Sequence, residues 1–393
     1  MSGWQRTPLA WKNLTSDRRK LLLISGGVSF AVVLMFMQIG FRNALFDNTI
    51  QLVKLLKADL VVVSRARYNL PSEQRFDAKY LQLIRGNEEV QDVLPIFVER
   101  SLTEIHVVGQ INRAIRVVGV PMEGTVFEDP DYDLKRDKLA DHHSALLDRR
   151  TKKVYKFETR DLEKLQHQEV ELSGKSIQMV DYVDVGTDFV HDGTIFISDQ
   201  AMATYFPLRN RLNPPLEAID FGLIQTKPGI DRRELQAKLS LLAPEELDVL
   251  TKDELMQREI TFWARSTPIG IIFTIGTIMG LVVGTIICYQ ILFTDITDHI
   301  AEFATLKAMG YGGSYFLSLI LAESLYLTVL GFVPGLGITL ILYQLLGRNT
   351  GLIMILTPSR IGFVFMLTLC MCIVSGLLAV RKLWSADPAS LFK

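Results

Sequence analysis

The sequence predicts an integral membrane protein with four transmembrane α-helices, one before and three after a large mixed α/β extracytoplasmic domain. Two observations lead to this fold class. Long apolar runs occur at both ends of the chain, and the charged residues concentrate between them. Residues 1–41 hold 6 charged residues, residues 42–265 hold 68, and residues 266–393 hold 11. The middle region therefore has the composition of a folded polar domain, and the ends have the composition of membrane segments.

The first span is predicted at residues 21–41, after a cytoplasmic segment at 1–20. The 21 residues of this run contain no charge, and at 1.5 Å per residue a helix of this length crosses the roughly 30 Å hydrocarbon layer. A signal peptide fits less well, because the run is too long for its apolar region and no small-x-small cleavage site follows. Apolar residues continue at helical spacing beyond Phe41, which predicts a helical stalk over residues 42–58.

Three further spans are predicted, at residues 266–294, 315–346 and 361–380. The middle one lies in a stretch whose single charge is Glu323 and which could hold two spans folded at Pro334. The part after Pro334 is only about 18 Å long as a helix, which is too short to cross a bilayer. We therefore predict one long span with a kink near Pro334.

The orientation of the spans follows from basic residues near their ends. They concentrate in the N-terminal segment and in the C-terminal tail at 381–393. Positively charged flanks face the cytoplasm, so both termini are predicted there. Residues 42–265 and the short loop at 347–360 then lie outside, and the segment at 295–314 lies inside.

The large central region predicts its own α/β fold. Runs of β-branched residues bounded by turn formers predict strands at residues 59–64, 114–121 and 194–198. Helices are predicted at 76–86 and 252–265, and residues 221–242 are typical of a strand, a turn and a helix. About 220 residues are enough to bury a core of their own. The domain has 31 basic and 37 acidic residues, which does not favour binding to nucleic acid.

No catalytic, metal or cofactor site is predicted. The Gly-Lys-Ser of residues 174–176 lacks the glycine five positions earlier that a phosphate loop needs, because that position holds Glu169. Adjacent histidines at 142 and 143 point to different faces and have no third His or Cys at ligand spacing. A solvated loop is favoured over a metal site for these histidines and for a second polar group, which consists of Asp181, Asp184, Asp188, His191 and Asp192.

Two features inside the spans allow alternative interpretations. Glu323 would cost roughly 2.5–3.5 kcal/mol at the membrane centre, so it either reaches the interface or neighbouring helices, or has a role in coupling. Glycines repeat at four-residue spacing in the second and third spans, which lets helix backbones approach closely. They fit packing within one subunit or a contact between two copies, and they are Gly276, Gly280, Gly284, Gly331 and Gly335.

The inner segment "ITDHIAEFATLKAMGYGGSYF", residues 296–316, holds helical periodicity and then ends on glycines. As a helix it places Ile296, Ile300 and Phe303 on one face, with Leu306 at the edge. A rigid helix between two spans can transmit a force to both of them. A position flat on the membrane surface is the alternative.

The residues "EFATLKAMGYGGSYFLSLILAES", "GFVPGLG" and "SADPASLF" resemble the permease subunits of the MacB/FtsX/LolC group of ABC transporters. The family signature E-x-x-x-L-[RK]-A-x-G is matched by Glu302, Leu306, Lys307, Ala308 and Gly310, and its terminal D-P-x-x-x-L by Asp387, Pro388 and Leu391. Phe303 and Ala304 depart from the Ile-Gly of many relatives. Within the family, "TPLAWKNLTSDRRKLL" and "ATLKAMGY" are most similar to the DevC branch of the cyanobacterial DevBCA exporters.

The resemblance implies a non-catalytic subunit of the bacterial inner membrane that relays movement of a separate cytoplasmic ATPase dimer, which would hold the ATP and Mg. The further partners it implies are a second copy of the chain, a periplasmic adaptor, a TolC-like channel and a lipid or glycolipid cargo. The ATPase-coupling residues would be Ile296, Ile300, Glu302, Phe303, Leu306, Lys307, Met309 and Gly310. One alternative is a regulatory FtsX-like permease that controls a cell-wall hydrolase. A membrane sensor is disfavoured, since no cytoplasmic segment exceeds about 20 residues.

Overall fold

A computed structural model describes residues 18–188, 190–209, 214–298, 300, 302, 305–306, 309–350, 352 and 354–384. The chain forms two compact units. The helical unit consists of Met1–Arg42, Ile269–Leu345 and Met354–Lys393, and the α/β unit consists of Asn43–Pro268 and Leu346–Ile353.

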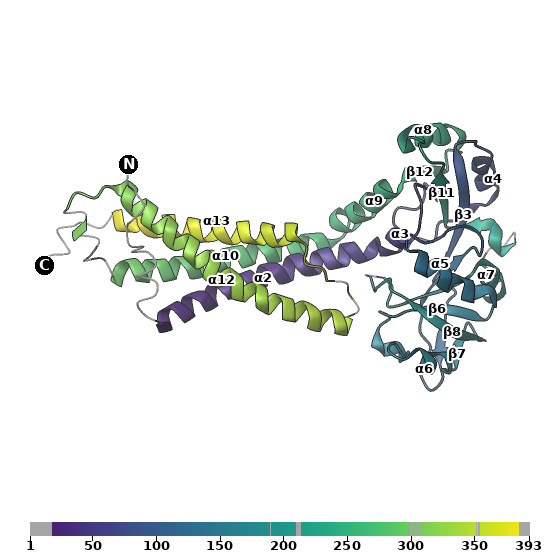
Figure 1. Ribbon diagram of the computed structural model, residues 1–393, viewed down its shortest axis with the longest axis horizontal. Coiled ribbons are helices and arrows are strands. Elements are labelled where there is room, and N and C mark those ends of the chain that lie inside the picture. The colour runs from purple at the N-terminus through teal and green to yellow at the C-terminus, as the bar shows by residue number, and fades with distance from the viewer. Residues whose placement is uncertain are drawn as a thin grey trace. The chain divides into compact units, whose positions relative to one another are not determined.

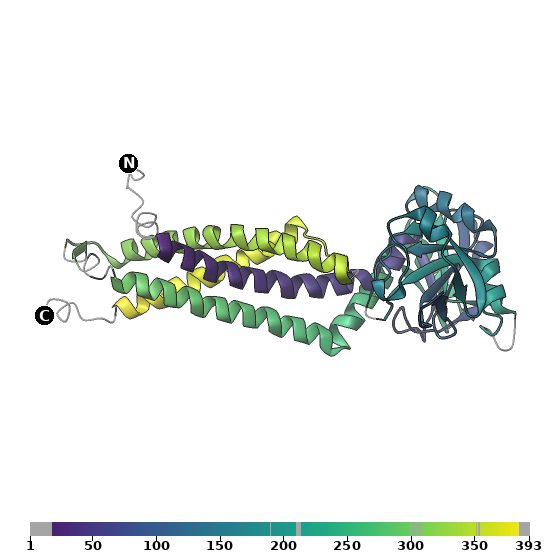
Figure 2. The same cartoon turned by 90° about the horizontal axis from the view of Figure 1, so that it is seen from below.

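The helical unit is built from long apolar helices that run side by side (Figure 2). Four stretches are long and apolar enough to cross a membrane: Leu21–Thr49, Gly270–Asp298, Gly313–Gly347 and Pro358–Ala379. They belong to α2 (Arg18–Thr49), α10 (Pro268–Asp298), α12 (Gly313–Thr350) and α13 (Pro358–Trp384). The number of spans agrees with the sequence-based prediction.

The observed helices are longer than the predicted spans. α2 continues eight residues past the predicted end at 41, and α10 continues from 294 to Asp298. The uncharged run marks the membrane-compatible part of each helix, whereas backbone hydrogen bonding continues through the polar residues beyond it. Pro334 lies inside α12, which extends on both sides of it.

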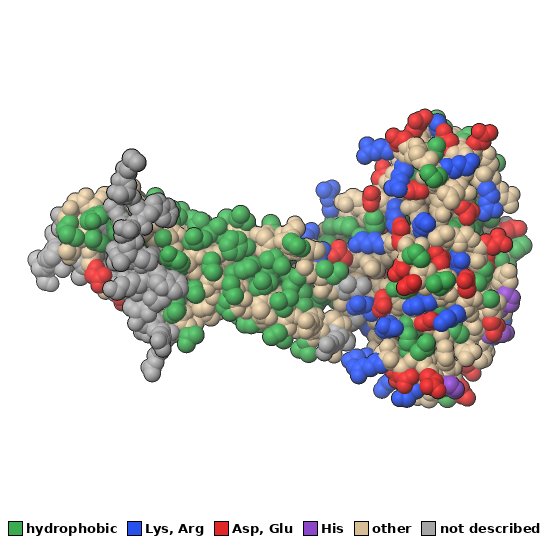
Figure 3. All heavy atoms as spheres, viewed as in Figure 1, with side chains coloured by type: hydrophobic (Ala, Val, Ile, Leu, Met, Phe, Trp, Pro, Cys, Tyr) green, Lys and Arg blue, Asp and Glu red, His purple; other side chains and the backbone are tan. Residues whose placement is uncertain are grey.

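The core of the helical unit is formed by side chains from all four helices. The ring of Phe332 in α12 lies 5.8 Å from that of Phe36 in α2 and 5.1 Å from that of Phe365 in α13. Outward-facing side chains are also apolar, and hydrophobic atoms dominate the surface of these helices in Figure 3. A surface of this kind suits lipid, whereas the charged surface of the α/β unit suits water.

The α/β unit is organised around a mixed ten-stranded sheet (Figure 1) with the order β12-β1-β11-β3-β5-β9-β6-β8-β7-β4. β5 pairs with β9, and β6 with β8, in parallel, and the other neighbours are antiparallel. A second sheet pairs β2 (Phe76–Asp77) with β10 (Ala218–Ile219). The strands of the large sheet are β1 Leu60–Ser64, β3 Val90–Glu99, β4 Ile105–Val107, β5 Arg116–Val120, β6 Ser144–Asp148, β7 Val170–Leu172, β8 Lys175–Val183, β9 Thr194–Ser198, β11 Phe221–Thr226 and β12 Leu247–Thr251.

Both faces of this sheet are buried. In β1, Leu60 and Val62 belong to one hydrophobic core, and Val61 and Val63 to the other. Successive side chains of a strand point to opposite faces, so a continuous apolar run is expected when both faces are covered. The uninterrupted Leu-Val-Val-Val of β1 therefore indicates a strand covered on both faces, and β1 lies between β12 and β11.

The helices divide between the two faces. Apolar side chains of α4 (Lys79–Arg85), α6 (Leu162–Gln166), α7 (Asp199–Tyr205) and α8 (Arg232–Leu242) contribute to the first core. Those of α3 (Gln51–Leu55) and α9 (Lys252–Arg265) contribute to the second, with Tyr132 of α5 (Pro130–Arg136) packed against it. The helix by which the chain enters the unit and the helix by which it leaves thus cover the same face of the sheet.

Most predicted elements of the α/β unit coincide with observed ones. The strands expected at 59–64, 114–121 and 194–198 are β1, β5 and β9, and the helix expected at 252–265 is α9. The helix expected over 76–86 is shorter, because Phe76 and Asp77 pair with β10 before α4 begins. The fold class, four apolar helices with a large mixed α/β domain after the first, is confirmed.

Candidate functional site

The segment after α10 is helical at its described positions and ends at a glycine. Ile300, Glu302, Thr305 and Leu306 are helical. The Met309 N–H donates to the Thr305 carbonyl at 3.0 Å, and the Tyr311 N–H donates to the Leu306 carbonyl at 3.2 Å. Gly310 has a φ of +91°. A bond from residue i to residue i−5 over a left-handed glycine is the Schellman arrangement that ends helices, so Gly310 terminates this segment.

The apolar face of the segment is in part covered by the chain itself. Ile296 is 3% exposed and belongs to the core of the helical unit, against which Leu306 also packs. Ile300 is half-buried, Glu302 is exposed and Met309 is 63% exposed. Phe303 and Lys307 lie outside the described residues. A partner would therefore meet Glu302 and Met309, whereas Ile296 and Leu306 hold the segment against the bundle.

The glycines of the second span face helix α2. A Cβ at Gly276 would lie 2.5 Å from the Gln38 carboxamide carbon, and one at Gly284 would overlap Met371 and Ala31. At Gly280 a Cβ would make ordinary contact with Met35 at 3.4 Å. The contact is tightest at Gly284, where a Cβ would collide with both α2 and α13, whereas Gly280 leaves room for a Cβ.

The glycines of the third span also face α2. A Cβ at Gly331 would overlap Val28, and one at Gly335 would lie 2.8 Å from Val32. All five predicted packing glycines lie against other helices of the same chain, and a contact between two copies stays a prediction. The face of α10 that leaves large apolar side chains exposed is a different one, and it includes Ile271, Ile275, Ile278, Val282 and Ile286.

Glu323 is enclosed in the helical unit. It is 0% exposed, as are Ser324 and Thr328 beside it in α12. The Ser324 hydroxyl donates to the Cys372 carbonyl of α13 at 3.1 Å, and the Ser375 hydroxyl donates to the Thr285 carbonyl of α10 at 2.8 Å. Glu323 is therefore enclosed by the protein, and its neighbour Ser324 links α12 to α13.

In the α/β unit, α9 carries a buried acid. The helix begins with a capping box formed by Thr251 and Glu254. Two turns further on, Glu259 is 2% exposed and accepts hydrogen bonds from the Leu70 N–H at 2.7 Å and the Trp263 Nε1–H at 2.6 Å. Burial raises the pKa of Glu259 to about 7. This carboxyl ties the helix that leads to the second span to the loop after β1.

The prediction of a solvated loop is wrong for three residues. Asp181 is buried in strand β8 and pairs with Lys138 at 2.6 Å. The other two are Asp188 and His191. Both are buried, and Asp188 forms an ion pair with Arg116 of β5 at 3.0 Å and contacts His191 Nδ1 at 2.9 Å. Burial and the Arg116 charge lower the pKa of His191. The loop turns inward because Arg116, 72 residues earlier in the chain, supplies the countercharge. In the described part of the chain no three metal-ligating side chains come together.

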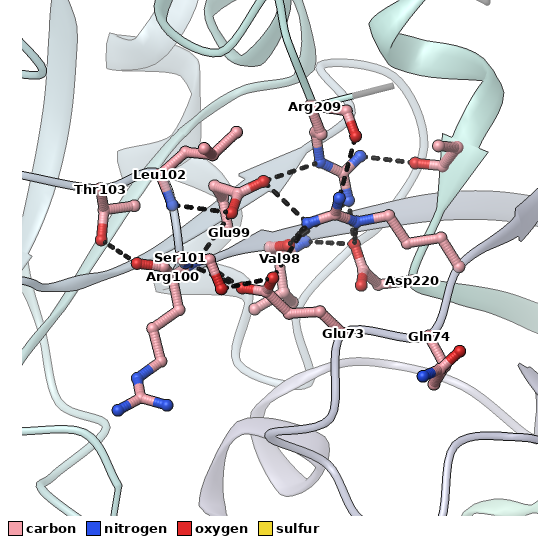
Figure 4. A network of polar contacts seen from close by, with 12 residues as sticks. Glu73, Gln74, Val98, Glu99, Arg100, Ser101, Leu102, Thr103, Arg209 and Asp220 are labelled. Carbon is pink, nitrogen blue, oxygen red and sulfur yellow. Dashed lines mark hydrogen bonds and ion pairs between the residues drawn. The ribbon is translucent and has the colours of Figure 1, made fainter. Parts of the chain in front are cut away.

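A larger network of buried charges surrounds Asp220 (Figure 4). The Asp220 carboxylate accepts from Arg67 at 2.5 Å, from Arg209, and from the Val98 N–H at 2.8 Å. Arg75 donates to Glu99 at 2.7 Å. Sequence analysis missed this network because its members are scattered over more than 150 residues of the chain. Because these buried arginines and acids pair with one another, we infer a structural role for the network rather than a catalytic one.

The Gly-Lys-Ser motif lies at a hairpin turn. Ser173 and Gly174 join β7 to β8, and both have positive φ, +49° and +76°. A two-residue loop with two positive φ values is a type I′ turn, which matches the twist of a hairpin. The Lys175 ammonium donates to the Thr204 carbonyl at 2.6 Å. The motif is therefore accounted for by strand pairing.

Residues 274–388 match the family model described as "FtsX-like permease C-terminal". Among solved structures, the chain is similar to the extracellular domain of the noncanonic ABC-type transporter YknZ from Gram-positive bacteria, with 12% identity, a TM-score of 0.33, and coverage of 50% of this chain and 100% of that one. It is also similar to the periplasmic region of MacB from Actinobacillus actinomycetemcomitans, with 12% identity, a TM-score of 0.33, and coverage of 50% and 90%. No curated protein sequence matches significantly.

The family match covers most of α10, the segment that ends at Gly310, and the helices α12 and α13. The matched range thus includes the packing glycines, Glu323 and the inner segment. With its four apolar helices, the chain is a multi-pass membrane protein, and its residues 274–388 match an FtsX-like permease domain.

Proposed function

We propose that this chain is the membrane subunit of an ABC exporter and relays ATP-driven movement of a separate cytoplasmic ATPase to its α/β unit. The match of residues 274–388 to an FtsX-like permease carries this proposal. The helical unit supports it, because glycines bring α10 and α12 tightly against α2. Helices packed in this way are suited to move together as a body.

The route for the movement begins at the inner segment. Ile296 and Leu306 hold the segment against the bundle, so a push on its exposed residues Glu302 and Met309 would displace α10 and α12. α10 follows α9 after only two residues, and α2 continues to Thr49, close in sequence to α3. α3 and α9 cover the same face of the sheet. Movement that arrives through α2 and α3, or through α10 and α9, would therefore act on the same hydrophobic core.

The remaining partners are part of the proposal. Two copies of the chain would bind an ATPase dimer that holds ATP and Mg, with the exposed face of α10 available for the contact between copies. With both termini cytoplasmic, the α/β unit would be periplasmic and would act with an adaptor and a TolC-like channel, as in a tripartite efflux system. If the chain is of the DevC type, the cargo would be an envelope glycolipid.

The experiment tests the exposed surface of the inner segment. The tagged full chain would be expressed in its own host and purified in detergent, and co-purifying chains with a nucleotide-binding motif would be identified by mass spectrometry. Glu302→Arg and Met309→Arg should abolish both this association and ATP hydrolysis by the purified complex. Glu171→Arg, which also reverses an exposed acid but lies on β7 of the α/β unit, should leave both unchanged.

Two results would contradict the proposal. One is the absence of any nucleotide-hydrolysing chain from the wild-type complex after cross-linking, and the other is full association and hydrolysis in both variants. A second function is favoured by the same family match, since an FtsX-like permease can regulate a cell-wall hydrolase without moving cargo. Recovery of a hydrolase or its activator, rather than an adaptor, by cross-linking from the α/β unit would select that function.

A further inference from the structure

The α/β unit contains an open cleft that the proposed function does not use. Its volume is about 330 Å³, and it lies between the start of β5 and residues 190–192. Cavities that bind small molecules usually measure about 300–1,000 Å³. The polar residues that line the cleft are Arg100, Asn112, Arg113, Arg116, Tyr155, His191 and Asp192.

The floor of the cleft is rigidly held. Arg116 is bound to Asp188 through Nη1, and its Nε and Nη2 donate to the Thr194 hydroxyl at 3.0 and 2.8 Å. The Tyr155 hydroxyl donates to the Ala114 carbonyl at 2.5 Å. Each of these side chains is buried, so the floor presents a fixed pattern of charge.

The rim carries two arginines whose charge is not balanced. In the part of the chain that the structure describes, neither Arg100 nor Arg113 forms a side-chain ion pair. Figure 4 shows the Arg100 side chain directed away from Glu73 and Glu99. The acid at the rim, Asp192, pairs with Lys152 at 2.6 Å. Arg100 also contributes to the lowered pKa of His191, after burial and Arg116, which agrees with a positive potential inside the cleft.

We propose that this cleft binds a small dianionic ligand, a phosphate monoester or a dicarboxylate, through the guanidinium groups of Arg100 and Arg113. Planar guanidinium forks match the oxygens of phosphate and carboxylate in bidentate hydrogen bonds. Two arginines without a countercharge match two negative charges. The volume exceeds what a bare anion needs, so it accommodates an organic group beside the Asn112 amide.

The position of the cleft connects the ligand to the helices that cover the sheet. Arg116 and His191 also line a second, enclosed cavity of about 20 Å³, whose other walls include Thr49, Leu52 and Glu259. These residues belong to α2, α3 and α9. A ligand in the cleft would thus contact Arg116 and His191 from one side. On their other side, these two residues face α2, α3 and α9.

The test measures binding of three probes to the full chain in detergent by isothermal titration calorimetry. The probes are inorganic phosphate, glycerol 3-phosphate and succinate, at constant ionic strength and at a pH where each is mainly dianionic. At least one should bind saturably. The double variant Arg100→Ala/Arg113→Ala should weaken that binding roughly 100-fold or more, because it removes two charge-assisted contacts.

Two further variants separate specific binding from general attraction. Arg160→Ala/Arg233→Ala removes the same charge from exposed positions outside the cleft and should leave the affinity unchanged. Arg100→Lys/Arg113→Lys keeps the charge but not the planar fork, and should bind with intermediate affinity. Tighter binding of glycerol 3-phosphate assigns the site to a phosphate ester, tighter binding of succinate to a dicarboxylate, and tighter binding of phosphate to the inorganic ion. Absence of saturable binding by all three probes, or equal losses in the two alanine double variants, overturns the proposal.

Discussion

The threonine hydroxyls of the helical unit and the buried charges of the α/β unit find their hydrogen-bond partners over different distances along the chain. In the helical unit, threonine hydroxyls bond within their own helix, as Thr368 does to the Val364 carbonyl at 2.8 Å and Thr339 to Gly335 at 2.8 Å. In the α/β unit, Arg67 reaches Asp220, 153 residues away, and Arg116 reaches Thr194, 78 residues away. Local bonds form as soon as a helix forms, whereas the distant ones exist only in the completed fold.

This difference follows from the two solvents. In lipid a threonine hydroxyl needs a partner inside the protein, and the carbonyl one turn earlier is always present. Other hydroxyls of the helical unit bond between helices, as Ser29 does to the Gly331 carbonyl and Tyr343 to the Phe36 carbonyl. A water-soluble domain can balance a buried charge with an opposite charge that arrives from elsewhere in the chain. We therefore expect that breaking the buried charge network lowers the free energy of unfolding of the α/β unit. Disturbing the apolar helix contacts should lower the stability of the helical unit.

The largest expected effect comes from breaking the long-range network. Asp220→Asn removes the charge that Arg67 and Arg209 share in a buried position. Removing one partner of a buried ion pair costs about 3–5 kcal/mol, so the free energy of unfolding of the α/β unit should fall by about that amount. Chemical unfolding followed by near-UV circular dichroism measures this change.

Asp248→Asn is the matched control for that substitution. Asp248 pairs with Arg65 and Arg258 near the surface, and exposed ion pairs contribute about 0–1 kcal/mol. Similar losses in the two variants would show that burial does not distinguish these networks.

The second effect is a pH dependence confined to the α/β unit. Glu259 has a pKa raised from 4.5 to about 7, so the folded state holds its proton more tightly than the unfolded state. The free energy of unfolding should therefore fall as pH rises from about 4.5 to 7, by about 3 kcal/mol in total from this group. Glu259→Gln should remove that part of the pH profile, and thermal unfolding from pH 4 to pH 8 measures it. A profile of unchanged shape in the variant would contradict the assignment.

The third effect tests close packing in the helical unit. Gly331→Leu places a side chain where Val28 of α2 already lies, and overpacking of this kind costs about 1–3 kcal/mol. Gly337→Leu in the same helix is the control, because a Cβ there meets no atom within 4 Å. The melting temperature of the detergent-solubilised chain should fall for the first variant alone. Equal melting temperatures would mean that α12 can move away from α2 without loss.

The smallest effect compares two fully buried threonines directly. Thr368→Val removes a bond to the preceding turn of its own helix, and we expect a loss of about 0.6 kcal/mol. Thr194→Val leaves the Nε and Nη2 groups of Arg116 without their acceptor, and we expect about 1–3 kcal/mol. The free energies of unfolding of the two variants measure this difference. Equal losses in both variants would contradict the prediction.

Sequence reasoning succeeded where the signal is local. The lengths of the uncharged runs indicated four spans, and β-branched runs located β1, β5 and β9. Gly310 was expected to end the inner helix, and its left-handed backbone does so. The same reasoning misjudged Asp188 and His191, because nothing near them in sequence shows the arginine that pairs with them.

Amino-acid order alone determined where this chain can enter a membrane, since an apolar run of sufficient length has that property in any fold. It also determined that both faces of β1 are covered, because the apolar run of that strand is uninterrupted. Only the tertiary structure decided which helix the glycines of α10 and α12 face, and which acid neutralises each buried arginine. The physical reason is that periodicity specifies the face of an element, whereas the partner of that face depends on how segments far apart in the chain are brought together.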